Sequence, residues 1–117
     1  MSYNPGTHVL ATLTTSNTDR LHQYKEFQAL VDALIASNDL QKLGEVYHNF
    51  SPAGYTAVVC LSESHLSIHT WPEYGKVNID IYLSNFQRNN DGTVQKLYEA
   101  MQRHFEATIE NEQIIRR

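Results

Sequence analysis

Hydrophobic and polar side chains alternate along much of the chain, a pattern that predicts β-strands. The predicted strands are residues 8–14, 45–50, 55–61, a more polar strand within 61–75, 77–84, and a last edge strand at 107–117. Several of these strands are apolar on both sides. We therefore expect neither face of the sheet to be wholly exposed to water.

Hydrophobic residues spaced three and four apart predict two amphipathic helices. The first is expected from Leu21 to Ile35, after a loop rich in helix-capping residues. The second is expected from Val94 to Phe105, with Asp91 as its cap. The order strand, helix, four strands, helix, strand predicts one α+β domain over residues 1–117, a two-layer sandwich whose mainly antiparallel sheet has both helices on one face.

Charge and composition exclude several classes of function. The 117 residues have a formal net charge of -4 and include one cysteine. The chain lacks the basic patch that nucleic-acid binding needs, an apolar run long enough to span a membrane, and the pattern of a signal peptide. We therefore expect a cytoplasmic protein with no nucleic-acid or membrane partner. Cys60 lies in an apolar run and is expected to fill space in the core.

Residues 61–75 contain most of the candidate chemistry. They read LSESHLSIHTWPEYG, with three serines, two histidines, two carboxylates and the only tryptophan. Two histidines four apart bind zinc when they share a helix face. On a strand, however, His65 and His69 would stand ~13 Å apart at ~3.3 Å per residue. We therefore expect no metal site here.

An activated serine is the other interpretation of this stretch. Ser64 follows Glu63 at the point where an apolar strand gives way to a polar one. A serine is inert unless a base, strain or a polarised carbonyl activates it, and His69 and Thr56 are candidates for that help. Hydroxyls and imidazoles on the wetter face of a strand are the alternative.

The run SESHLSIHTWPEYG resembles the self-processing segment of the prokaryotic S-adenosylmethionine decarboxylase proenzymes, small pyruvoyl-dependent enzymes of spermidine and polyamine biosynthesis. The resemblance continues more loosely through residues 6–8, 48–54 and 79–82. It implies that the Ser64 hydroxyl attacks the Glu63 carbonyl and that elimination then splits the chain between these residues. The pyruvoyl group left at residue 64 forms a Schiff base with the substrate amine and accepts electrons as carbon dioxide leaves.

The same resemblance implies roles for other residues. His69 would assist the elimination, and Thr56 would steady the processing intermediate. Glu73 would bind the ribose hydroxyls of the substrate, because a carboxylate accepts two hydrogen bonds at once. Phe50 would stack on the adenine. A solvated turn position for Glu73 and a core position for Phe50 are the alternatives.

The resemblance also implies an assembly. Its members are face-to-face dimers with sites near the interface, so we expect a homodimer of processed protomers. The apolar strand faces agree with this expectation.

Two positions depart from the family pattern. Ser84 stands where the family has its proton-donating cysteine, and Thr12 where it usually has a glutamate. An alcohol is a far weaker acid than a thiol of pKa ~8.5, so reprotonation of the product is expected to be slow, or to use water or Tyr82. Three functions follow in order of preference: decarboxylation of S-adenosylmethionine, pyruvoyl-dependent decarboxylation of arginine or ornithine, and non-catalytic regulation of an active partner.

Overall fold

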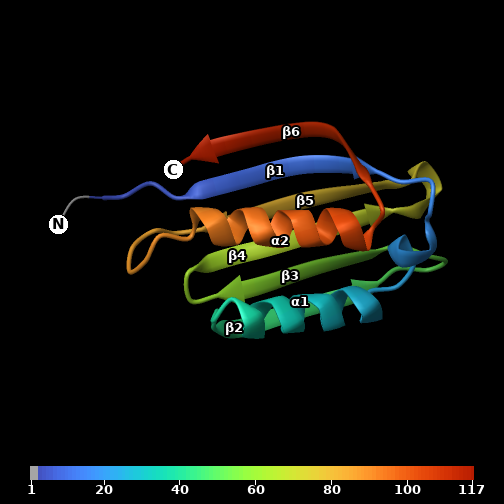
Figure 1. The fold of residues 1–117 in the computed structure, drawn as a ribbon. Coiled ribbons are helices and arrows are strands. Elements are labelled where there is room, and N and C mark those ends of the chain that lie inside the picture. The colour runs from blue at the N-terminus through green and yellow to red at the C-terminus, as the bar shows by residue number, and fades with distance from the viewer. Residues whose placement is uncertain (1–2) are drawn as a thin grey trace.

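The alternating segments of the chain pair into one six-stranded sheet, and both helices pack on the same face of it (Figure 1). The structure is a computed structural model that describes residues 3–117. Its elements are β1 (Thr7–Thr14), α1 (Lys25–Ser37), β2 (Lys42–Asn49), β3 (Tyr55–Leu61), β4 (Ser64–Trp71), β5 (Lys76–Leu83), α2 (Asp91–His104) and β6 (Thr108–Arg116), with short 3₁₀ helices at Asp19–Leu21 and Pro72–Tyr74. The predicted α+β two-layer sandwich and its element order are confirmed.

The sheet has the strand order β2-β3-β4-β5-β1-β6, and every neighbouring pair is antiparallel. The amino-terminal strand β1 thus lies between β5 and β6 rather than at an edge. This register pairs His8 with Tyr82 and Leu10 with Asp80. Residues some seventy positions apart in sequence are therefore neighbours on the sheet.

A tight hairpin joins β3 to β4. Leu61 pairs with Ser64, so only Ser62 and Glu63 form the turn. Ser64 also pairs with Leu83 at the end of β5. The Glu63–Ser64 peptide bond is consequently at one end of the sheet, next to the residues that follow β5.

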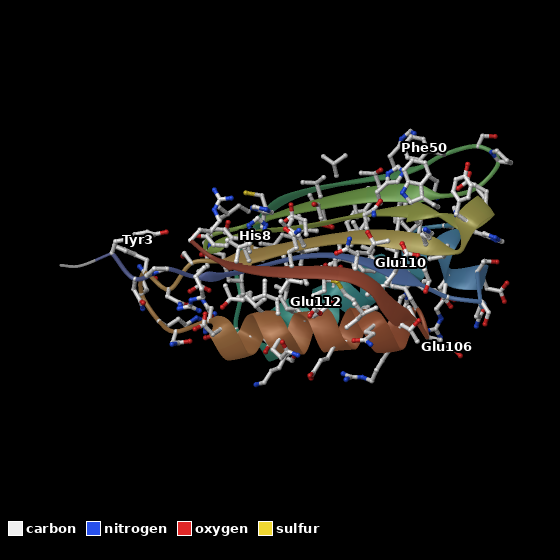
Figure 2. All side chains as sticks on the ribbon, turned by 90° about the horizontal axis from the view of Figure 1, so that it is seen from above. Tyr3, His8, Phe50, Glu106, Glu110 and Glu112 are labelled. Carbon is white, nitrogen blue, oxygen red and sulfur yellow. The ribbon has the colours of Figure 1, made fainter. Side chains whose placement is uncertain are left out.

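The hydrophobic core lies between the sheet and the helices. Along β4, Leu66, Ile68 and Thr70 are buried toward the helices, and the residues between them are half-exposed on the other side. Figure 2 shows the helices on one side of the sheet and the other side without cover. We call this uncovered side the open face. It exposes large apolar side chains, namely Val46, Phe50, Val58, Trp71 and Ile115.

Three local predictions were wrong, and two of them concern Cys60 and the first helix. Cys60 is exposed and lies opposite His65 on the open face, because its neighbours Val59 and Leu61 take the positions that face the core. Helix α1 begins at Lys25 instead of Leu21, since Leu21 belongs to a separate 3₁₀ turn. None of the helices formed within residues 3–117 is long and apolar enough to cross a membrane.

Asp91 begins α2 but does not cap it, because the cap position is Asn90 and no side chain there bonds to the helix. Its carboxylate instead joins three segments. It accepts hydrogen bonds from Thr7 at 2.7 Å and Asn85 at 3.1 Å, and pairs with Arg116 at 2.8 Å. These contacts lower the pKa of Asp91 from 3.8 to about 2, and the hydrogen bond from the Thr7 hydroxyl has the largest effect.

Replacing Asp91 by asparagine should therefore destabilise the fold in a pH-dependent way. A depressed pKa means that the carboxylate stabilises the fold above pH 3.8 and loses this effect as the pH falls towards 2. For a side chain that is one-third exposed, we expect a loss of about 1 kcal/mol at neutral pH and a shallower acid transition. Urea unfolding from neutral pH down to acid measures both, with Glu99→Gln on the outer side of α2 as control. Equal stability of Asp91→Asn and the native chain at neutral pH would contradict this assignment.

Candidate functional site

The backbone is strained where β4 begins. Ser64 has a φ of +141°, a region that residues with a side chain rarely adopt. Such strain costs roughly 1–3 kcal/mol and persists only where surrounding contacts impose it. The carbonyl oxygen of the preceding residue, Glu63, accepts a hydrogen bond from the backbone N–H of Ser84 at 2.8 Å. A hydroxyl-bearing residue thus follows a carbonyl that is polarised by a backbone donor.

The side chain of Glu63 is fixed by Arg88. The guanidinium donates from Nε to Oε1 at 3.0 Å and from Nη2 to Oε2 at 2.8 Å. Arg88 also donates to the backbone carbonyls of Asn38 and Asp39, at 3.3 and 2.9 Å. This pairing lowers the pKa of the Glu63 carboxyl. The hairpin turn is therefore tied to the loop between α1 and β2, by an arginine that the sequence did not point to.

Two histidines and an aspartate form a cluster on the open face, and one of these histidines contacts Ser64. The Ser64 hydroxyl lies 3.1 Å from Nδ1 of His65. Nε2 of His65 is 3.4 Å from Oδ1 of Asp80, and Nε2 of His8 is 2.6 Å from the same oxygen. No role for His8 or Asp80 could be predicted from the sequence, because only the pairing of β1 with β5 brings them together.

These three side chains are also a candidate metal-binding group. One ligand atom from each of His8, His65 and Asp80 lies within 4.8 Å of the others. Imidazole and carboxylate ligands suit zinc. The contacts to Asp80, however, already explain the cluster as a polar group assembled around one carboxylate.

His69 and Thr56 form a second group near the other end of β4. Their residues pair across β3 and β4, and Oγ1 of Thr56 lies 2.5 Å from Nδ1 of His69. The rings of Trp71 and Phe50 lie 4.4 and 5.8 Å from the His69 ring. Phe50 is 43% exposed, so a core position for it is excluded. Glu73 is exposed in the adjoining 3₁₀ helix.

The two groups do not meet within one chain. Ser64 and His69 are five residues apart on a strand, which is ~16 Å at ~3.3 Å per residue. Figure 2 shows the labelled side chains of His8 and Phe50 well apart along the sheet, one beside each group. The sequence-based expectation that His69 and Thr56 assist Ser64 is therefore not met by the geometry of a single chain.

A cavity of about 470 Å³ lies on the open face between the two groups. Its lining includes Thr12, Thr56, His69, Asn78 and Asp80. The Thr12 hydroxyl accepts a hydrogen bond from Asn78 at 2.9 Å, and Asn78 accepts one from Trp71 at 2.7 Å. Thr12, one of the two departures from the family pattern, therefore lies in the wall of this cavity.

Ser84, the other departure, directly follows β5. Its backbone makes the contact to the Glu63 carbonyl, and its own carbonyl accepts a hydrogen bond from Asn90 at 2.9 Å. Tyr82 lies on the open face and donates its hydroxyl to the carbonyl of Arg117 at 2.8 Å. A hydrogen bond with Tyr3 raises the pKa of Tyr82, so its proton is less available for transfer.

Comparison with known proteins shows which family the chain belongs to. Residues 7–117 match the family model described as S-adenosylmethionine decarboxylase. The S-adenosylmethionine decarboxylase proenzyme of Archaeoglobus fulgidus is 40% identical over 77 residues, which cover 66% of this chain and 69% of that protein. The proenzyme of Aquifex aeolicus is 36% identical over 101 residues, 86% of this chain and 70% of that protein. The crystal structure of the adenosylmethionine decarboxylase from Aquifex aeolicus matches with a TM-score of 0.84 at 27% identity, covering 99% of this chain and 92% of that one.

Proposed function

Because the chain belongs to the S-adenosylmethionine decarboxylase family, we propose that it is a self-processing, pyruvoyl-dependent carboxy-lyase that acts on S-adenosylmethionine in cytoplasmic polyamine biosynthesis. The observation that carries the proposal is the strained Ser64 next to the polarised carbonyl of Glu63. Both residues lie within the matched segment. Strain and a polarised carbonyl are what an otherwise inert serine needs in order to react.

Processing begins when the Ser64 oxygen bonds to the carbonyl carbon of Glu63 and the carbon–nitrogen bond breaks. The peptide bond becomes an ester, and the nitrogen of Ser64 becomes a free amine. Loss of the proton on the Ser64 α-carbon then expels the Glu63 carboxylate and splits the chain. Water replaces the nitrogen, ammonia leaves, and a pyruvoyl group remains at residue 64. When formed, this group supplies the ketone that bonds to the substrate amine and accepts electrons during decarboxylation.

The backbone of Ser84 assists the first of these steps. Its N–H lies 2.8 Å from the Glu63 carbonyl oxygen and would stabilise the negative charge that develops there. A backbone donor does not depend on the side chain at position 84. Serine in place of the family's cysteine therefore spares chain cleavage and affects only the later return of a proton to the substrate.

A homodimer would complete the site. We infer that two open faces pack together about a two-fold axis, which covers their exposed apolar side chains. Such an axis near the middle of β4 brings Ser64 of one protomer to His69 of the other, although the two lie ~16 Å apart within a chain. The partner's His69, paired with Thr56, would then take the proton from the Ser64 α-carbon.

Substrate binding would use the same end of the partner. Phe50, already exposed on the open face, offers its ring to the adenine. Glu73 offers two carboxylate oxygens to the ribose hydroxyls. Both residues lie near His69, so they would reach the site from the same chain as that histidine.

The substrate is tested by release of carbon dioxide from S-adenosylmethionine, arginine and ornithine. We expect release from S-adenosylmethionine alone. Replacing Ser84 by cysteine should raise that rate by at least ~10-fold, because a thiol donates a proton near neutral pH far better than an alcohol. The matched control is Ser62→Cys, which adds a thiol to the neighbouring turn and should leave the rate unchanged.

Thr12 and Ser84 favour the second candidate, a decarboxylase of arginine or ornithine. Release from either amino acid, and none from S-adenosylmethionine, would establish that function in place of the first. A cleaved chain that releases nothing from any of the three would contradict both.

A further inference from the structure

The Ser64 hydroxyl has a base of its own within the same chain. We propose that His65 takes the Ser64 proton in the first step of self-processing and that Asp80 positions His65 for this task. The inference rests on the self-processing proposed above and deepens it. It assigns the step that forms the ester to residues of one protomer, whereas elimination uses the partner's His69.

The geometry fixes which nitrogen of His65 faces the serine. Nδ1 lies 3.1 Å from the Ser64 hydroxyl, and Nε2 faces Asp80 at 3.4 Å. A carboxylate attracts the N–H of the imidazole, so the contact with Asp80 favours the tautomer of His65 with its hydrogen on Nε2. The lone pair of Nδ1 then points to Ser64, as a base requires.

His8 holds Asp80 in place. It is buried, and its Nε2 contacts the carboxylate at 2.6 Å. Its Nδ1 is buried without a hydrogen-bond partner among the described residues. A lone pair costs less in that position than an unpaired N–H, so this geometry favours the imidazole hydrogen on Nε2, where it is donated to Asp80. The buried imidazole thus fixes the position of the carboxylate beside His65.

The step balances without any added reagent. The Ser64 proton moves to Nδ1 of His65 as the serine oxygen bonds to the Glu63 carbonyl carbon. The oxyanion accepts the N–H of Ser84, which lies 2.8 Å from that oxygen. As the carbon–nitrogen bond breaks, His65 returns the proton to the departing amine and is neutral again.

The test stops processing at the ester. A His69→Ala chain lacks the group for elimination and should accumulate an ester at Glu63–Ser64, which hydroxylamine cleaves. We expect His65→Ala in this background to slow hydroxylamine cleavage by ~100-fold, the low end of what a general base contributes. Asp80→Asn should slow it by ~10-fold. Imidazole added to the buffer should restore part of the His65→Ala rate, which a purely structural role would not allow.

Two controls separate this inference from the function on which it rests. His22→Ala removes an exposed histidine that precedes α1 and is not part of the cluster around Asp80, so this chain should cleave at the background rate. If the His69→Ala chain itself resists hydroxylamine, no ester forms, and the proposed processing is wrong. If it is cleaved and the His65→Ala double variant is cleaved equally fast, the role of His65 is overturned. His65→Gln, closer in size to histidine, should stay folded and still be slow.

Discussion

Replacing Ser64 by alanine is expected to leave the chain at full length and to abolish decarboxylation. The Ser64 hydroxyl is the nucleophile of processing, and Ser64 is the source of the ketone. Its loss therefore prevents both chain cleavage and formation of the pyruvoyl group. Enzymes accelerate reactions by at least ~10⁶-fold, and we expect the whole of that factor to disappear. Gel electrophoresis under denaturing conditions and carbon dioxide release measure the two effects.

Ser62→Ala is the matched control, because Ser62 lies in the turn of the same hairpin and its backbone N–H donates to the carbonyl of Gln41. It should be cleaved and active like the native chain. A positive φ is as unfavourable for alanine as for serine, so the backbone strain at position 64 remains in Ser64→Ala. The substitution should therefore leave the fold unaffected. Full turnover by Ser64→Ala would refute the pyruvoyl mechanism.

The second large effect concerns the partner chain. We expect His69→Ala and Ser64→Ala chains to remain uncleaved when each is made alone. When they are mixed and refolded together, the His69→Ala chain should be cleaved, because its intact Ser64 faces the intact His69 of the other chain. Random pairing of equal amounts puts about half of the chains in mixed dimers, so about half of the His69→Ala chains should be cut.

An affinity tag on one variant shows whether mixed dimers form. Mixed dimers without any cleavage would mean that Ser64 and His69 act within one chain, against the ~16 Å between their positions on β4. Normal cleavage of the His69→Ala chain alone would remove the role of His69. Thr56→Ala, which removes the hydroxyl 2.5 Å from His69, should behave in the mixture like His69→Ala.

Much of the fold could be predicted from the sequence because its strands and helices follow simple periods. Alternation located most of the strands, and spacings of three and four located both helices. Alternation also determines which side of the sheet Cys60 faces. Its apolar neighbours led to the wrong prediction that it fills space in the core. In strand β3 the neighbours of a buried residue face away from the core, so residue 60 is exposed while Val59 and Leu61 are buried.

The site could be predicted only in part. The composition of the segment around Ser64 indicated a site there. Nothing in the sequence indicated that His8, Asp80 and Arg88 belong to it. His8 and Asp80 are 72 positions apart, and they meet because β1 pairs with β5, a register that no local pattern reveals. Arg88 lies in a polar loop without periodicity, and its pairing with Glu63 depends on how that loop folds back.

Closeness in sequence was also misleading. Ser64 and His69 belong to one short motif, yet an extended strand places them far apart in one chain. The motif therefore indicates the family without indicating which chain supplies each residue.

The most direct test of the account is the mass of the purified native chain under denaturing conditions. We expect two pieces. One is residues 1–63 with a free carboxylate on Glu63, and the other is residues 64–117, lighter by one ammonia than the same piece with a serine amino terminus. A single mass for the uncut chain after prolonged incubation would contradict the claim that this protein makes its own ketone from Ser64.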